Sequence, residues 1–267
     1  MTKVIVAGAA GRMGCRLIAL ANASKELQLV GALEAKGHPA LGQDAGALAG
    51  CGTLGIPLTE DLSSLIGQGD VVIEFSNPSA TLEHLACIAQ ARKAMVIGTT
   101  GFSQEELSHL NSLTTTIPCV FAPNMSVGVN VLLKALADMA KIFGDDYDIE
   151  VVESHHHLKK DAPSGTALKI AEVLADSLHR DLGTVGVYGR QGLVGERTKT
   201  EIGIHAVRAG DIVGDHTVFF GGIGERIEVT HRAHSRDTFA SGALRAARWV
   251  VTQQPGLYDM QDVLGLK

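Results

Sequence analysis

The stretch that decides the fold is Val4–Gly14, VIVAGAAGRMG, in which an apolar run leads into three regularly spaced glycines. Four consecutive apolar residues followed by glycine indicate a buried strand, and the next segment has the spacing of an amphipathic helix. Glycines between a strand and a helix let a pyrophosphate approach the backbone N–H groups at the positive helix end. The spacing is G-x-x-G-x-x-G rather than the commoner G-x-G-x-x-G, so a tight turn that binds nothing is the alternative.

Apolar and amphipathic segments continue to alternate through the first half of the chain. After Val4–Ala7, strands are expected at Gln28–Leu33, Val71–Phe75, Ala94–Gly98 and Cys119–Ala122, and helices at Gly11–Asn22, Ser79–Arg92, Ser103–Thr114 and Gly128–Phe143. Strands separated by helices pair in parallel through right-handed crossovers. This half therefore predicts a Rossmann-like parallel sheet in a dinucleotide-binding domain over residues 1–126.

The pattern changes after about residue 147. We expect a strand at Asp148–Ser154, a helix at Gly165–His179, and strands at Glu201–Val207, His216–Gly221 and Arg226–His231. The last three strands have short, glycine-rich connections without helices, which predicts a meander. Residues 127–235 should thus form a smaller α+β domain with an open mixed sheet, and residues 236–267, with a helix at Asp237–Thr252, should complete the first domain.

Composition excludes several classes of protein. The chain has 267 residues, of which 45% are hydrophobic and 19% charged, as in folded globular proteins rather than disordered ones. A net charge of −6 argues against a nucleic-acid partner. The four cysteines form no C-x-x-C pair, which argues against a disulfide framework or a zinc knuckle. No apolar run approaches the roughly 20 residues of a membrane span, and we expect a cytoplasmic protein.

Further segments strengthen the prediction of a dinucleotide site. Glu34 ends the next strand twenty residues after Gly14, where a carboxylate can accept hydrogen bonds from adenosine ribose hydroxyls. Two more loops should lie at the same carboxyl edge of the sheet. The candidate cofactor residues are Gly8, Ala9, Ala10, Gly11, Arg12, Met13, Glu34, Gly98, Thr99, Thr100, Ala122, Pro123, Asn124 and Met125.

A second chemical motif occupies Glu153–Ala167, ESHHHLKKDAPSGTA. Three successive histidines suggest a metal site, but neighbouring strand side chains point to opposite faces and no other ligand stands at a recognisable spacing, so we predict no metal. Imidazole and ammonium groups instead suit acid–base catalysis, and a solvated basic loop is the alternative without function. Joint use of His155 and His156 requires a turn at that point. Pro163–Thr166 opens a helix, whose N–H groups offer a carboxylate site.

The pattern E-x-H-H-x-x-K-x-D-A-P-S-G-T-A at 153–167 resembles the signature of the dihydrodipicolinate reductase family, and the resemblance extends over essentially the whole chain. Supporting segments lie at 8–14, 96–102, 124–130, 208–214 and 256–260. The resemblance implies an oxidoreductase of lysine and diaminopimelate biosynthesis that reduces 4-hydroxy-tetrahydrodipicolinate, a small cyclic dicarboxylate, to tetrahydrodipicolinate. Hydride would come from NADH or NADPH.

The resemblance also implies roles for individual residues. His155 and Lys159 match the family's acid–base pair, with Lys159 as proton donor and His155 as donor or acceptor. Substrate contacts are implied for His156, Ser164, Gly165, Thr166 and Arg236. The smaller domain would bind the substrate and assemble a homotetramer. His157 and Lys160 occupy variable positions of the signature, so no catalytic role is assigned to them.

Three questions stay open at the level of sequence. Another two-domain dehydrogenase, using Cys119 as nucleophile, is an alternative enzyme, although Cys119 lies in an apolar run. A nucleotide-sensing protein without catalysis would need Glu34 but not the acid–base pair. For the cofactor, Glu34 is followed by Ala35 rather than by an arginine that would suit the extra phosphate of NADPH, so NADH is expected to be preferred, with Lys36 and Arg12 allowing NADPH.

Overall fold

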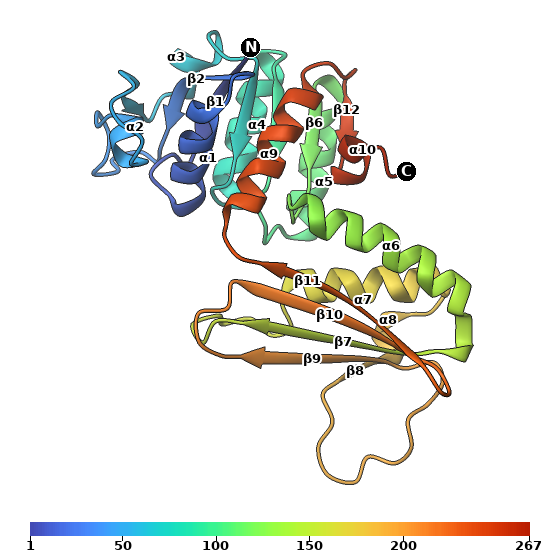
Figure 1. The fold of residues 1–267 in the computed structure, drawn as a ribbon. Helices are drawn as coiled ribbons and strands as arrows, with labels where there is room; N and C mark the ends of the chain where they lie inside the picture. The colour runs from blue at the N-terminus through green and yellow to red at the C-terminus, as the bar shows by residue number, and fades with distance from the viewer. The chain divides into compact units, whose positions relative to one another are not determined.

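The computed structural model describes residues 1–267, and the chain divides into two units (Figure 1). The first unit contains Met1–Val127 and Arg236–Lys267, and the second contains Gly128–Ser235. No helix in either unit is both long and apolar enough to cross a membrane.

A seven-stranded sheet forms the centre of the first unit. Its strands are β1 (Thr2–Ala7), β2 (Leu27–Leu33), β3 (Leu58–Thr59), β4 (Val71–Glu74), β5 (Ala94–Ile97), β6 (Pro118–Phe121) and β12 (Gly256–Tyr258). Their order is β12-β6-β5-β4-β1-β2-β3, and every neighbouring pair is parallel. The parallel sheet predicted from the alternating pattern is therefore confirmed.

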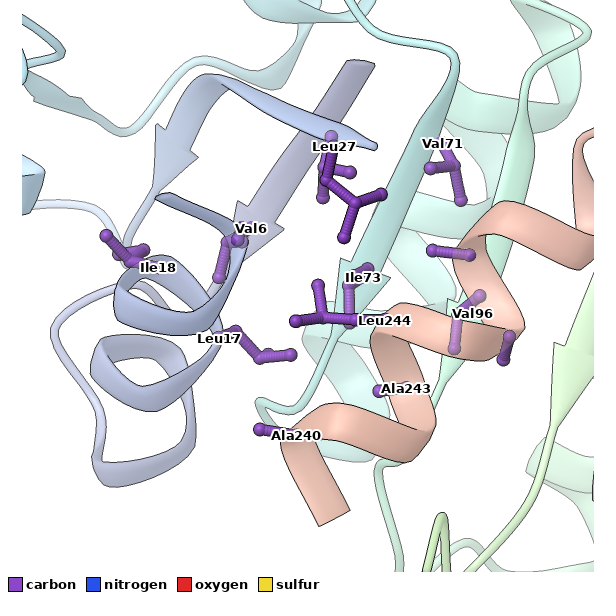
Figure 2. Packing of buried hydrophobic residues seen from close by; sticks show 14 of the residues in the cluster. Val6, Leu17, Ile18, Leu27, Val71, Ile73, Val96, Ala240, Ala243 and Leu244 are labelled. Carbon is purple, nitrogen blue, oxygen red and sulfur yellow. The ribbon is translucent and has the colours of Figure 1, made fainter. Parts of the chain in front are cut away.

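Helices cover both faces of this sheet. They are α1 (Arg12–Ala23), α2 (Ala45–Leu48), α3 (Leu62–Ile66), α4 (Pro78–Gln90), α5 (Gln104–Leu113), α9 (Asp237–Val250) and α10 (Met260–Leu264), with a 3-10 turn at Thr114–Thr116. Strand side chains alternate between the faces. Val6 and Ile73 pack with α1 and α9, as Figure 2 shows, whereas Ile5 and Val72 pack with α4 and α5 on the other side. Asn77 caps α4 by accepting from the N–H of Ala80, and Pro78 occupies the first helical position.

The second unit places helices on one mixed sheet. It comprises α6 (Val127–Phe143), a 3-10 turn at Gly144–Asp146, β7 (Asp148–His155), α7 (Gly165–Ser177), α8 (Leu182–Val185), β8 (Gly186–Tyr188), β9 (Ile202–Arg208), β10 (Gly214–Gly221) and β11 (Arg226–Ala233). Apolar side chains of α6 and α7 share a core with Ile149, Val151 and Val218 of the sheet. The same face of β7 and β10 continues, at one end, into the buried polar residues Glu153, His155 and His216 described below.

The predicted meander of the last three strands is wrong in one respect. β10 and β11 form the expected antiparallel hairpin, but β7 lies between β9 and β10 in the order β11-β10-β7-β9-β8. β7 pairs in parallel with β9 and antiparallel with β10. Because the chain leaves the sheet after His155, the connection 209–213 can pass over the end of β7. β7 buries Ile149, Val151 and Glu153 on one face, which favours a central position.

The long predicted elements end within two residues of their observed bounds, whereas seven elements of two to five residues were not predicted: β3, β8, β12, α2, α3, α8 and α10. Segments this short are too brief to show a hydrophobic period, and neighbouring strands or local caps stabilise them instead. Asp44, for example, caps α2 and accepts further N–H groups from Leu54, Gly55 and Ile56.

We expect Gly242→Ala to lower the free energy of unfolding by about 1–3 kcal/mol, because an added Cβ would lie 1.7 Å from the carbonyl oxygen of Met125. Alanine is otherwise favoured over glycine in a helix by about 1 kcal/mol, so a loss would report the close approach of α9. Urea unfolding measures the effect. Ser241→Ala, on an exposed position of the same helix, is the control and should change stability by less than about 0.5 kcal/mol. An unchanged or stabilised Gly242→Ala protein would contradict this packing.

Candidate active site

The glycine loop of the first unit has a backbone that larger residues would disturb. Gly8 has φ +67°, and a Cβ on Gly14 would lie 2.2 Å from the carbonyl oxygen of Gly8. Gly11 precedes α1 without any side-chain cap, and the first turn of α1 contains no acidic residue. The loop therefore fits an anionic group such as a pyrophosphate, because the N–H groups at the start of α1 and the Arg12 side chain bring positive potential to this end.

Glu34 is directly connected to this loop. Its Oε2 accepts from the backbone N–H of Ala10 at 2.9 Å, and its Oε1 accepts from the N–H of Ala35 at 2.9 Å. The carboxylate at the end of β2 thus lies beside the glycine loop at the end of β1, where the sequence placed it. Ala9 is fully buried, while Arg12 and Ala35 are exposed and Met13 is half-buried.

The two remaining cofactor loops follow β5 and β6, which are neighbours in the sheet. Thr99 is buried with its hydroxyl bonded to that of Thr81 at 2.9 Å, so its side chain supports the fold, whereas Thr100 is exposed. The ring of Phe75 occupies the space beside Gly98, within 2.2 Å of where a Cβ would be. In the other loop Ala122 and Met125 are buried, Pro123 is exposed, and Asn124 Oδ1 accepts from the N–H of Ser126.

In the second unit, a fully buried carboxylate organises the end of β7. Glu153 Oε2 accepts from His155 Nδ1 at 2.5 Å and from Arg208 at 2.8 Å. Its Oε1 accepts from Arg208 at 2.8 Å and from the N–H of Ser164 at 3.0 Å. Burial opposes ionisation of Glu153, but the hydrogen bonds from Arg208 and His155 outweigh it and hold the pKa of the carboxyl below its usual value.

A second histidine, His216 of β10, lies against the first. The rings of His155 and His216 meet edge to face with centroids 5.3 Å apart, and His216 Nε2 lies 3.1 Å from the hydroxyl of Ser164. Burial, reinforced by the nearby His155, lowers the pKa of His216 to about 4. His216 is therefore neutral at physiological pH.

The turn that the sequence required after His155 is present. β7 ends at His155, and the N–H of Lys159 donates to the carbonyl of His156 at 3.1 Å. Lys159 Nζ is paired with both carboxylate oxygens of Asp161, at 2.9 and 2.8 Å, and this pairing lowers the pKa of Asp161. His157 Nδ1 donates to the carbonyl of Gly210 at 2.9 Å.

The first turn of α7 stands beside these groups. Ser164 is buried and caps the helix by accepting from the N–H of Ala167, so its hydroxyl is already engaged by the cap and by His216. Gly165 is exposed, with nothing near the place of a Cβ, and Thr166 follows at half burial. The structure thus brings together His155, Lys159, Ser164 and Gly165 in one unit. Arg236 belongs to the other unit, at the start of α9, and its contact with the substrate stays a prediction.

Sequence reasoning missed three members of this cluster: Glu153, Arg208 and His216. Glu153 and Arg208 both lay in segments that carried the family resemblance, but no local pattern indicates that they pair. His216 lies in an ordinary alternating strand, and only the order of strands places it opposite Glu153. Cys119, by contrast, is fully buried in β6, and burial raises the pKa of its thiol, which does not suit a thiolate nucleophile.

The low pKa of His216 predicts acid sensitivity of the fold. In the unfolded chain a histidine takes up a proton near pH 6.5, whereas folded His216 resists protonation until about pH 4, so stability falls as pH decreases through this window. The full effect is about 3 kcal/mol. Urea unfolding of the unmodified protein and of His216→Gln at several pH values measures the difference in their unfolding free energies. This loss of stability should be largest at pH 7 and should shrink toward pH 4. A cost that stays constant across the window would contradict a neutral buried imidazole.

Comparison with known proteins adds independent findings. Residues 2–125 match the family model described as "Dihydrodipicolinate reductase, N-terminus", and residues 128–264 match "Dihydrodipicolinate reductase, C-terminus". The chain is 55% identical, over the full length of both chains, to the 4-hydroxy-tetrahydrodipicolinate reductases of Syntrophus aciditrophicus and Citrifermentans bemidjiense. It also resembles the solved structure of a dipicolinate-bound dihydrodipicolinate reductase from Paenisporosarcina sp. TG-14, with a TM-score of 0.76, 26% identity and 98% of each chain covered. The resemblance seen in the sequence is thereby confirmed, and this chain belongs to the dihydrodipicolinate reductase family.

Proposed function

We propose that this protein is an NAD(P)H-dependent oxidoreductase that reduces 4-hydroxy-tetrahydrodipicolinate to tetrahydrodipicolinate in lysine and diaminopimelate biosynthesis. Family membership over the full chain supports the reaction. The observation that carries it is the gathering of His155, Lys159 and the first turn of α7 around the end of β7. This cluster combines acid–base groups with a carboxylate-binding helix end, which a protein that only senses nucleotides would not need.

The substrate carboxylates would bind at the start of α7. There the helix dipole favours an anion, and Gly165 at the start of the helix is exposed. Gly165 and Thr166 would contact a carboxylate directly, with His156 beside them. Ser164 would instead hold the helix end in place, because its hydroxyl is already engaged by the cap and by His216. Arg236 would supply a further cation.

Replacing the 4-hydroxyl of the substrate by hydrogen consumes one hydride and one proton and releases one water. Lys159 would donate the proton from its ammonium group, with His155 as donor or acceptor of a proton at Nε2. In the structure Lys159 is held by Asp161, which is largely exposed, whereas the side chain of Lys159 is 20% exposed. A dianionic substrate would compete with Asp161 for this ammonium, and the ion pair keeps Lys159 oriented until then.

The cofactor would supply the hydride, and this chain's residues would hold it. The glycine loop Gly8–Gly14 would bind the pyrophosphate, Glu34 the adenosine ribose, and the loops after β5 and β6 the nicotinamide end. A carboxylate at Glu34 would repel the extra phosphate of NADPH, which supports a preference for NADH over NADPH. The cytoplasmic location and the homotetramer built from the second unit remain predictions of the sequence.

The direct test is an assay with NADH and freshly generated substrate, in which absorbance at 340 nm falls as the reaction proceeds. Lys159→Ala should lower kcat by roughly 10²- to 10⁴-fold, because it removes one acid–base group, and should leave NADH affinity nearly unchanged. Lys160→Ala is the matched control, since Lys160 is exposed and has no assigned role. Normal turnover in the Lys159→Ala variant would exclude Lys159 as the proton donor. NADH binding without any reduction by the unmodified protein would favour nucleotide sensing instead.

We expect Ala35→Arg to shift the ratio of kcat/KM values several-fold toward NADPH, because one charge-assisted contact to the added phosphate is worth on the order of 1 kcal/mol. Ala35 is exposed and adjoins Glu34, so the new side chain needs no repacking. Ala35→Gln controls for length without charge. Steady-state kinetics with both cofactors at fixed ionic strength provide the measurement. A strong preference for NADPH in the unmodified protein would show that Lys36 or Arg12 already binds this phosphate.

A further inference from the structure

The buried hydrogen bonds of Glu153 define the protonation pattern of His155. An ionised carboxylate has only acceptors, so the proton between Glu153 Oε2 and His155 Nδ1 must be carried by the imidazole. Neutral His155 is then the Nδ1–H tautomer, and its Nε2 carries the lone pair. Nε2 makes no hydrogen bond to the protein, and the nearby residue of β10 is Gly214, where a Cβ would stand 3.0 Å from it. A glycine at position 214 therefore leaves the space beside Nε2 free of a side chain from that residue.

Glu153 is itself fixed by donors on both of its oxygens. Arg208 donates one N–H to each oxygen, and the N–H of Ser164 donates to Oε1. The same guanidinium donates to the carbonyl of Asp161 at 2.7 Å, so it also holds the segment that carries Lys159. The carboxylate therefore cannot rotate away from His155 without breaking contacts to β9 and α7.

We propose that Glu153 is a positioning residue for the reduction, which holds the proton of neutral His155 on Nδ1, so that Nε2 carries the reactive lone pair, and supplies the counter-charge when this imidazole takes up a proton. The proposal rests on the proposed function for its catalytic consequence, but the tautomer itself can be measured without activity. Arg208 acts on His155 only through Glu153, because its guanidinium binds the Glu153 carboxylate and the carbonyl of Asp161 in the segment that carries Lys159.

Glu153→Gln is the informative variant, since it keeps the shape and removes the charge. Arg208 donates to both oxygens, but the Ser164 N–H donates only to Oε1 and cannot become an acceptor, whereas His155 Nδ1 can. The glutamine oxygen would therefore take the Oε1 position, and its NH₂ group would face His155 Nδ1. An NH₂ group donates its hydrogen, which forces the imidazole proton onto Nε2. The substitution should therefore move the proton of neutral His155 from Nδ1 to Nε2, rather than only make the imidazole ring more mobile.

Two measurements follow. In ¹⁵N NMR spectra of histidine-labelled protein at pH 8, with His155 assigned through His155→Gln, the unmodified protein should show protonated Nδ1 and bare Nε2, and Glu153→Gln the reverse. In kinetics, Glu153→Gln should lower kcat on the order of 10²-fold with little change in KM. We expect His155→Gln to abolish one limb of the pH–rate profile. Glu153→Gln should move that same limb to lower pH, because protonated His155 loses its counter-charge.

Glu150→Gln is the matched control on the same strand. Glu150 is also held by arginines, Arg190 and Arg197, and by His205, but it faces the other side of the sheet. Although burial opposes its ionisation, these partners lower the pKa of Glu150 to about 2. Its substitution should reduce stability without moving the pH limb. Glu153→Asp keeps the charge but shortens the reach to His155, so it should lower kcat while leaving the limb near its original pH.

The outcomes separate the two proposals. Failure of the unmodified protein to reduce the substrate would overturn the proposed function, and the NMR experiment would still test the tautomer. An Nε2-protonated His155 in the unmodified protein would overturn the positioning role, and this result does not depend on whether any Glu153 variant folds. An active Glu153→Gln protein with an unmoved pH limb and an unchanged tautomer would overturn it as well.

Discussion

A single buried carboxylate, that of Glu153, determines how the end of β7 is built. An ionised group without exposed surface is tolerated only when its oxygens receive hydrogen bonds, and here the donors come from His155, Arg208 and the N–H of Ser164. Two of these donors lie close to Glu153 in the sequence, whereas Arg208 is 55 residues away on another strand. The requirement to satisfy one charge therefore brings β7, β9 and the start of α7 to a common point, where we propose that a substrate carboxylate meets the acid–base pair.

The charges at this site are more evenly balanced than the basic sequence around Lys159 suggested. Arg208 is paired with Glu153, and Lys159 with Asp161. His216 adds no positive charge, because burial keeps it neutral. Attraction of a dianionic substrate would then depend less on net positive charge than on exchangeable contacts: the exposed Asp161 can be displaced from Lys159, while the buried Glu153 cannot be displaced from Arg208.

In the first unit the main constraint is that backbone segments approach one another closely, which requires glycine at particular positions. Gly8 needs a positive φ, Gly14 lets α1 pack against the loop, and Gly242 lets α9 pack against Met125. A glycine-lined loop alone is compatible with many nucleotide proteins, and the contact of Glu34 with Ala10 narrows the interpretation toward a dinucleotide. Family membership then distinguishes this chain from other two-unit dehydrogenases. The alternative of a dehydrogenase with a cysteine nucleophile is also disfavoured, because Cys119 is buried and its thiol pKa is raised.

The sequence by itself determined the parallel sheet, the long helices, the mixed second sheet and the family, because hydrophobic period, glycine spacing and the 153–167 motif are local signals. It also indicated that the chain must turn after His155 if its histidines act together. Only the tertiary structure decided that β7 separates β9 from β10, and hence that Arg208 and His216 flank Glu153. Strand order depends on which faces are buried across the whole sheet. That order determines which side chains lie next to a buried charge, so neither the strand order nor the partners of Glu153 can be predicted from one segment of sequence.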